Sequence, residues 1–97
     1  MPDKTVIWLR LALQDLDNMM RHLEKNADRA IAANMAERIW KAGQSLQVLS
    51  SRGRLGKVTG TREFVLTNAP YYLSYRVRGD IVEILRIIHF ARQYPKQ

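Results

Sequence analysis

The first half of the chain arranges hydrophobic and polar positions in two successive patterns. Residues 5–9 (TVIWL) are mostly β-branched or aromatic, which predicts a short buried strand. Large apolar residues then recur at steps of three and four, which places them on one face of a helix: Leu9, Leu13, Leu16, Met20 and Leu23. This pattern breaks at residues 26–28 (NAD), where the helix is expected to end.

A second amphipathic helix is predicted over roughly twenty residues after this break. Its apolar positions again step by threes and fours: Ile31, Met35, Ile39, Ala42, Leu46 and Leu49. Asn26 or Asp28 can cap its first turn, because both side chains accept hydrogen bonds from backbone N–H groups. Two such helices joined by so short a turn must form an antiparallel helical hairpin.

Four side chains of these helices allow more than one interpretation. Met19, Met20 and Met35 are expected to fill gaps in the core rather than to bind a metal or a cofactor. Trp40 lies beside the apolar stripe, so it belongs either to the core or to a contact surface.

The second half of the chain predicts a loop followed by three strands. Residues 50–63 hold three glycines and four cations, which predicts a basic loop, and they lack the spacing of a phosphate-binding P-loop. Residues 62–67 alternate as a strand does, and residues 68–70 (NAP) turn the chain. Two further β-rich runs flank Gly79 and Asp80, a pair that suits a two-residue hairpin turn with glycine first.

This turn sets which residues of the last two strands lie opposite each other, and paired residues share a face of the sheet. The expected pairs are Val77 with Val82, Arg76 with Glu83, Tyr75 with Ile84, and Leu73 with Arg86. One face is then apolar apart from Arg86: Tyr71, Leu73, Tyr75, Val77, Val82, Ile84 and Ile88. The other face mixes apolar and charged residues, as binding surfaces do: Tyr72, Ser74, Arg76, Arg78, Glu83, Leu85, Ile87 and His89.

Arg86 is the exception on the apolar face. An unpaired buried charge is prohibitively costly, so Arg86 requires a carboxylate, backbone carbonyls or an aromatic ring beside it. Asp15 or Asp17 of the first helix is the expected partner.

The order of these elements predicts the α+β class. We expect a β-α-α-β-β-β arrangement, with an antiparallel sheet packed on one face by the helical hairpin and the first strand at an edge. The 97 residues suit one domain, residues 1–97.

Charge adds an expectation about partners. The net charge is +7. Residues 1–50 hold seven Lys or Arg against six Asp or Glu, whereas residues 51–97 hold nine against three. This imbalance favours an anionic partner. The absence of cysteine excludes disulfides, thiolate metal sites and a cysteine nucleophile. No signal peptide or membrane span fits the pattern, so a soluble, cytoplasmic protein is expected.

Several segments are recognisable as an ordered set. GRLGKVTGTRE (residues 53–63), YYLSYRV (71–77) and GDIVEILRIIHFARQYP (79–95) follow ALQDL (12–16) and AERI (36–39). Together they resemble the RelE/ParE toxin superfamily of bacterial type II toxin–antitoxin systems, over essentially the whole chain. The resemblance implies the RelE/ParE toxin fold. It also implies a toxin that needs no cofactor and assembles with a cognate antitoxin, whose acidic, amphipathic C-terminal segment orders on binding.

The superfamily contains two activities, and the resemblance favours one of them. RelE-like members cleave messenger RNA in the ribosome, whereas ParE-like members inhibit DNA gyrase. The loop and the C-terminal ending are closest to the ParE form, and Tyr72 stands where ribonuclease members carry a catalytic arginine. We therefore expect a gyrase inhibitor without catalytic residues or a metal. If the chain is instead a ribonuclease, the candidate catalytic residues are Arg54, Arg62, Arg76 and His89.

Two binding surfaces follow from this interpretation. The gyrase-binding candidates lie in the basic loop and the C-terminal ending: Arg52, Arg54, Lys57, His89, Arg92 and Tyr94. The antitoxin-binding candidates lie on the mixed face of the last hairpin: Tyr72, Arg76, Arg78, Glu83, Leu85 and Ile87. A third hypothesis is a non-toxic basic module that binds nucleic acid through phosphate contacts, although the sequence shows no recognition helix or stacking platform.

Overall fold

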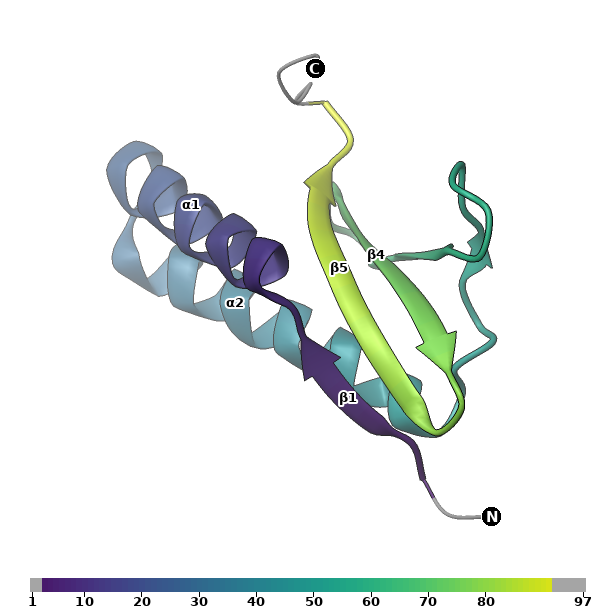
Figure 1. Cartoon of the computed structure of the whole chain (residues 1–97). Coiled ribbons are helices and arrows are strands. Elements are labelled where there is room, and N and C mark those ends of the chain that lie inside the picture. The colour runs from purple at the N-terminus through teal and green to yellow at the C-terminus, as the bar shows by residue number, and fades with distance from the viewer. Residues whose placement is uncertain (1–2, 92–97) are drawn as a thin grey trace.

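The computed structural model describes residues 3–91. Two helices pack on one face of a five-stranded sheet (Figure 1). Along the chain the elements are β1 (Thr5–Trp8), α1 (Arg10–Asn26), α2 (Arg29–Gln44), the 3₁₀ turn η1 (Ser45–Gln47), β2 (Arg54–Leu55), β3 (Arg62–Val65), β4 (Tyr71–Arg78) and β5 (Ile81–His89). The α+β class and the expected order of the elements are confirmed, with β2 as an addition.

The strands lie in the order β1-β5-β4-β3-β2. β2, β3, β4 and β5 pair antiparallel as a meander, while β1 joins the β5 edge in parallel, so the sheet is mixed rather than wholly antiparallel. The hairpin turn is confirmed, because Gly79 alone has a positive φ (60°) in the two-residue connection between β4 and β5. The loop that carries β2 extends at the sheet edge opposite to β1 (Figure 1).

The helical hairpin forms where the periodicity predicts it. Asp28 is the cap of α2, since its carboxylate accepts a hydrogen bond from the Ile31 N–H at 2.8 Å. The predicted apolar stripes are wrong at three positions, because Leu13, Ile31 and Leu49 are 51%, 48% and 54% exposed. The buried face of α1 is displaced slightly from the predicted apolar stripe. Helix α2 ends at Gln44, so Leu49 lies beyond it.

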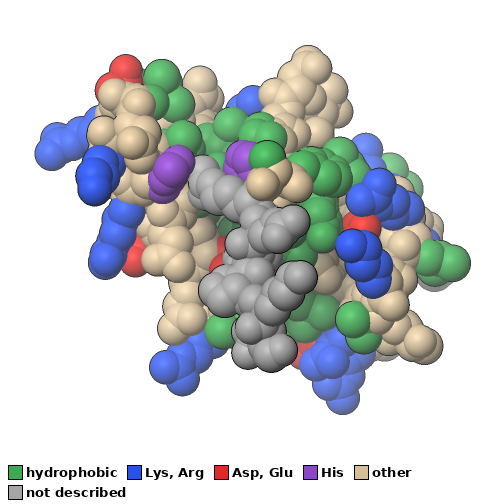
Figure 2. Space-filling view, turned by 90° about the horizontal axis from the view of Figure 1, so that it is seen from above, with side chains coloured by type: hydrophobic (Ala, Val, Ile, Leu, Met, Phe, Trp, Pro, Cys, Tyr) green, Lys and Arg blue, Asp and Glu red, His purple; other side chains and the backbone are tan. Residues whose placement is uncertain are grey.

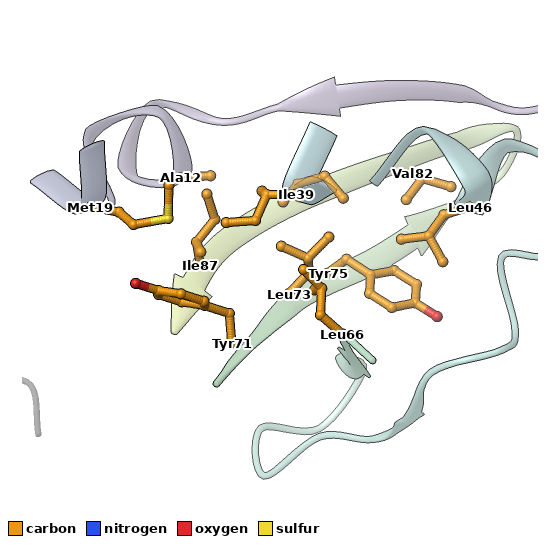
Figure 3. Close-up of a cluster of buried hydrophobic side chains, with 11 residues drawn as sticks. Ala12, Met19, Ile39, Leu46, Leu66, Tyr71, Leu73, Tyr75, Val82 and Ile87 are labelled. Carbon is orange, nitrogen blue, oxygen red and sulfur yellow. The ribbon is translucent and has the colours of Figure 1, made fainter. Parts of the chain in front are cut away.

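The core lies between the helices and the sheet (Figure 3). Side chains of both helices and η1 contact those of β4 and β5, and the buried cluster is Ala12, Met19, Ile39, Leu46, Leu66, Tyr71, Leu73, Tyr75, Val82, Ile84 and Ile87. Met19 is buried and Met20 and Met35 pack against this cluster, which confirms their assignment to the core. Val77, expected in the core, is 38% exposed near the end of β4.

Trp40 belongs to a stacked pair at the edge of the core. Its ring lies parallel to that of Trp8, with centroids 5.5 Å apart and an interplanar angle of 15°, and it is 51% exposed. The Trp8 indole N–H donates a hydrogen bond to Gln44 Oε1 at 3.2 Å. Trp40 therefore covers a core residue while presenting its other side to solvent.

A β-bulge changes the register that the hairpin turn predicts. The pairs Val77–Val82, Arg76–Glu83 and Tyr75–Ile84 are as expected. The next pair is Ser74 with Arg86, because Leu85 is an extra residue in β5. Leu73 consequently lies opposite Ile87, and the predicted pairing of Leu73 with Arg86 is wrong.

The bulge exchanges the faces of Ile87, Ile88 and His89, since side chains alternate along a strand. Ile87 was expected on the mixed face, but it is buried in the core at 2% exposure. Ile88 was expected in the core, but it lies opposite Tyr72 on the other face. His89 was also expected on the mixed face, whereas it pairs with the buried Tyr71.

Candidate functional site

The sheet face turned away from the helices, here called the outer face, collects most of the predicted antitoxin-binding residues, Tyr72, Arg76, Arg78 and Glu83, together with Arg54. The register places Glu63, Ser74 and Ile88 on the same face, which thus extends across four strands. Ile7 of β1 lies opposite Glu83 and extends this face to the edge. The outer face carries two separate groups of interacting side chains, one at each end of β4.

The first group, the aromatic cluster, consists of Arg54, Glu63, Tyr72 and Phe90. Arg54 Nε donates a hydrogen bond to Glu63 Oε1 at 2.9 Å, and the Glu63 side chain is only 10% exposed. The guanidinium lies 5.8 Å from the centroid of Tyr72 and 5.9 Å from that of Phe90. The two rings are themselves 5.1 Å apart. Nothing local in the sequence marks Phe90 as a member of this group, because its contacts with Tyr72 and Arg54 join segments distant in the chain.

The environment of Tyr72 shifts its acidity. Burial raises the pKa of the Tyr72 phenol, the Glu63 carboxylate raises it further, and the Arg54 guanidinium opposes both. Tyr72 is therefore a neutral phenol at physiological pH. It can donate or accept a hydrogen bond, but it is poorly suited to act as a general base.

The second group, the hairpin triad, consists of Arg76, Arg78 and Glu83. Arg76 Nε donates to Glu83 Oε1, and Arg78 Nη1 lies 3.8 Å from the same oxygen. The expected pair of Arg76 and Glu83 is confirmed. Since two arginines share one carboxylate, the triad keeps a net positive charge beside the turn.

An apolar groove adjoins the outer face where β1 ends and α1 begins. It has a volume of about 640 Å³ and is lined by Leu9, Arg10, Leu11, Leu85 and Arg86. Leu11, in the first turn of α1, is 53% exposed. Leu85 was predicted as a binding residue from its face, and the bulge places it in this groove.

Arg86, which lines this groove, forms an ion pair with Asp15 of α1. Two guanidinium nitrogens of Arg86 donate to the two carboxylate oxygens of Asp15, at 2.7 and 2.9 Å. Asp15 Oδ2 also accepts from the Ile87 N–H at 2.9 Å. The expected carboxylate partner is thus Asp15, while Asp17 pairs with Arg21 on the surface of α1. This arrangement holds α1 against the bulge.

The basic loop, residues 50–61, is anchored to the sheet by side chains of β3 and β4. The buried Tyr75 hydroxyl donates to Ser50 O at 2.7 Å and accepts from the Gly53 N–H at 2.9 Å. Arg62 Nη1 donates to Gly53 O at 2.8 Å and to Ser51 O at 3.3 Å. Arg62 therefore braces the loop from the helix side of the sheet. Its side chain is not directed to the outer face.

The remaining predicted gyrase-binding residues lie in two different parts of the structure or outside the described residues. Arg52 lies over the ring of Phe64 at 4.8 Å and donates to Ser45 Oγ, and Lys57 is exposed in the loop. The His89 ring meets the edge of Tyr71 with centroids 5.0 Å apart, and His89 Nδ1 accepts from the Ala91 N–H. Arg92 and Tyr94 lie outside the described residues. Of the predicted gyrase-binding residues, the structure therefore places those of the basic loop and of the end of β5.

The four candidate ribonuclease residues do not converge. Arg54 and Arg76 belong to different groups of the outer face, and each is paired with a glutamate. Arg62 braces the basic loop from the other face, opposite Tyr75, and His89 packs on Tyr71 at the far end of the hairpin. Within residues 3–91 no three His, Asp or Glu side chains are grouped to hold a metal ion.

Positive charge is distributed rather than concentrated. Lys and Arg side chains are spread around the surface seen in Figure 2, with no single basic block in that view. Both carboxylates of the outer face, Glu63 and Glu83, are already paired with arginines. Of the helices in the described part of the chain, none is long and apolar enough to cross a membrane.

Comparison with known proteins agrees with this fold. The model of the family described as ParE toxin of the type II toxin–antitoxin system, parDE, matches residues 6–94. "Putative toxin Y4kP" of Sinorhizobium fredii is 38% identical over 96 residues, which cover 99% of this chain and 98% of that protein. "Toxin RelE2" of Caulobacter vibrioides is 38% identical over 87 residues, which cover 90% of this chain and 96% of that protein.

Two solved structures share the architecture. A chain of the chromosomal ParDE system from P. aeruginosa has a TM-score of 0.83 and 28% identity, covering 89% of this chain and 95% of that chain. A chain of the RelBE2 toxin–antitoxin complex from Mycobacterium tuberculosis has a TM-score of 0.61 and 24% identity, covering 95% of this chain and 97% of that chain, which supports the fold alone. The mixed sheet, the helical hairpin and the family match agree, and the chain belongs to the ParE toxin family of type II toxin–antitoxin systems.

Proposed function

We propose that this toxin inhibits DNA gyrase by binding it, without breaking bonds itself, and that its cognate antitoxin neutralises it by covering the outer face. The observation that carries the first part is the separation of the potential catalytic residues. Cleavage of RNA needs a base, an acid and a phosphate-stabilising cation within hydrogen-bond reach of one substrate. Here Arg62 and His89 are on the helix side, whereas Arg54 and Arg76 are on the outer face.

The pairing of the outer-face arginines supports the same proposal. The Arg54 guanidinium faces the carboxylate of Glu63, which is almost fully buried. To bind a scissile phosphate, Arg54 would have to leave a buried carboxylate uncompensated, which is costly. Tyr72, the residue at the position of the ribonuclease arginine, carries no positive charge.

Ribosome-dependent cleavage of messenger RNA is the second candidate function. The name of the Caulobacter relative, "Toxin RelE2", is the observation that favours it. Under this alternative His89 and Arg54 would move protons and stabilise the phosphate, and substitution of either by alanine would stop cleavage.

One pair of assays separates the two functions. Purified toxin is added to gyrase with relaxed plasmid and ATP, and separately to translating ribosomes whose messenger is mapped for cuts. We expect supercoiling to be inhibited, with trapped cleaved DNA, while the messenger stays intact. Cleavage at defined codons that His89→Ala or Arg54→Ala abolishes would establish the ribonuclease instead.

The outer face has the chemistry to bind an acidic amphipathic segment of the antitoxin. The groove beside Leu11 and Leu85 offers apolar area, and the hairpin triad supplies unneutralised positive charge. Ile7 and Phe90 are 40% and 51% exposed on this side. A disordered segment that folds on binding could bury its apolar side chains here while its carboxylates meet Arg76 and Arg78.

A further inference from the structure

The basic loop exposes two aliphatic side chains near its tip. Leu55 is 79% exposed, more than any other large hydrophobic side chain within residues 3–91, and Val58 is 68% exposed. Each directly follows a cation, since Arg54 precedes Leu55 and Lys57 precedes Val58. Single exposed aliphatic residues are common on protein surfaces. Two exposed aliphatic side chains on one short segment indicate a binding site only if the segment has a fixed shape.

The loop does have a fixed shape. The Tyr75 hydroxyl and Arg62 anchor its first half, as described above. Its second half is closed by hydrogen bonds from the Gly56 N–H to Thr61 O at 2.8 Å and from the Thr61 hydroxyl to Val58 O at 2.6 Å. A Cβ atom at Gly53 would lie 2.7 Å from the Tyr75 oxygen, so the backbone approaches the sheet as only glycine permits.

A rigid loop that exposes aliphatic groups is prepared for binding. Because the backbone is already ordered, little conformational entropy remains to be lost when a partner covers Leu55 and Val58. Leu55 and Val77 also flank a hollow of about 220 Å³, lined in addition by Gly60, Thr61 and Arg62. The apolar area is therefore continuous with a concave surface at the sheet edge, on the side away from the outer face.

The composition of the loop indicates the kind of partner. Residues 50–61 contain three cations, no carboxylate and no aromatic ring. Cations alone would suit phosphates, but non-specific contact with single-stranded nucleic acid also uses aromatic rings for stacking. Aliphatic tips add nothing to phosphate contacts, whereas they fill pockets at protein interfaces.

We propose that the tip of the basic loop, Leu55 and Val58, inserts into an apolar pocket rimmed by carboxylates on the target protein. This inference rests on the proposed function and deepens it, because it makes the contact with gyrase a contact with protein rather than with DNA. Lys57 then meets a carboxylate at the rim, Arg54 keeps its pairing with Glu63, and Tyr75 and Arg62 position the loop.

The test compares matched substitutions of exposed leucine and valine. Leu55→Gln with Val58→Gln removes the apolar tip without removing a charge or an anchoring hydrogen bond. Leu13→Gln is the control, because Leu13 is also exposed and lies on α1, far along the chain from the loop. Binding to gyrase without DNA and inhibition of supercoiling are measured for each protein, with antitoxin binding and thermal midpoint as checks on folding.

We expect the double variant to bind gyrase at least about tenfold more weakly, as loss of interface anchor residues does. The control should match the wild type, and all three proteins should share antitoxin affinity and thermal midpoint. If the wild type inhibits gyrase and the double variant inhibits equally well, the loop-tip proposal is wrong while the proposed function stands. If the wild type neither binds nor inhibits gyrase, both are wrong.

Discussion

At the scale of single residues, two side chains join separate elements of this small fold through hydrogen bonds to backbone atoms. Asp15 accepts hydrogen bonds both from the Arg86 guanidinium and from the Ile87 N–H, so one carboxylate joins α1 to the bulge of β5. The Tyr75 hydroxyl performs the equivalent task for the basic loop, because it donates to Ser50 O and accepts from the Gly53 N–H. Both residues are buried or nearly so, and substitution of either removes hydrogen bonds that join two elements.

The first prediction concerns Asp15. Asp15→Ala leaves the Arg86 guanidinium and the Ile87 N–H without their carboxylate, and we expect it to lower the free energy of unfolding by about 3 kcal/mol. Asp17→Ala removes only an exposed pair with Arg21 and should cost less than about 1 kcal/mol. Urea denaturation measures both. Equal losses in the two variants would show that the position of Asp15 has no special importance.

A second prediction concerns Tyr75 and pH. Burial raises the pKa of the Tyr75 phenol above its ordinary value near 10, although Gly53 and nearby arginines partly oppose the rise. The native state therefore holds the phenolic proton more tightly than the unfolded chain. The stabilisation is fully present below the unfolded pKa of about 10, and it is lost as the pH rises through the folded pKa.

The matched variant is Tyr75→Phe, which lacks the titrating group. At pH 7 it should be about 1–3 kcal/mol less stable than the wild type, because Ser50 O and the Gly53 N–H lose their partner. The difference should stay constant up to about pH 9 and shrink above pH 10. Thermal midpoints of the two proteins across this range provide the measurement, and a difference that is unchanged at pH 11 would contradict the assignment.

At the scale of elements, the packing of the helices on the sheet depends on two close contacts, one at the bulge of β5 and one between α2 and β1. The bulge at Leu85 rotates the end of β5, so that Ile87 enters the core and Leu85 enters the groove beside α1. The second contact lies between α2 and β1, where the Trp8 ring passes over Gly43 and stacks on Trp40. Helix α2 can approach β1 so closely because Gly43 has no side chain.

A third prediction follows for Gly43. A Cβ atom there would lie within 2.6 Å of Cη2 of Trp8, a ring that also stacks on Trp40. Gly43→Ala should therefore destabilise the protein by about 1–3 kcal/mol, even though alanine favours helix more than glycine does. Adding Trp8→Leu should recover part of that loss. A Gly43→Ala protein as stable as the wild type would show that the ring can shift freely.

At the scale of the whole molecule, the two faces of the sheet have separate tasks in the proposed mechanism. The helix side supplies the core and the anchors of the basic loop, whereas the outer face carries charged groups and borders the groove. If the antitoxin and the target bind these separate surfaces, as we propose, substitutions will weaken one interaction and leave the other intact.

A fourth prediction tests the antitoxin surface with two neighbouring leucines. Leu11 and Leu13 are 53% and 51% exposed in the same helix, but only Leu11 lines the groove. Leu11→Glu should weaken antitoxin binding by about tenfold or more, because it puts a charge into an apolar contact, whereas Leu13→Glu should have little effect. Calorimetric titration with the purified antitoxin measures both affinities, and equal affinities would place the antitoxin elsewhere.

Much of the candidate site was predictable from local signals. The sequence located the outer-face residues Tyr72, Arg76 and Glu83, because period-two alternation and a glycine turn determine the register near the turn. It failed beyond Leu85, since nothing in the alternation marks the bulge, next to which the Ile87 N–H donates to Asp15 of a distant helix. It also missed Phe90 in the aromatic cluster, because that contact joins the end of β5 to β2 and β4.

The sequence by itself determined the α+β class, the order of the elements and the hairpin turn at Gly79, and it limited the cap of α2 to Asn26 or Asp28, because each depends on residues close together in the chain. Only the tertiary structure decided which face Ile87 and His89 occupy, which carboxylate binds Arg86, and how the basic loop is held. These features arise from hydrogen bonds and packing between segments up to 72 residues apart, and such contacts leave no periodicity in the sequence.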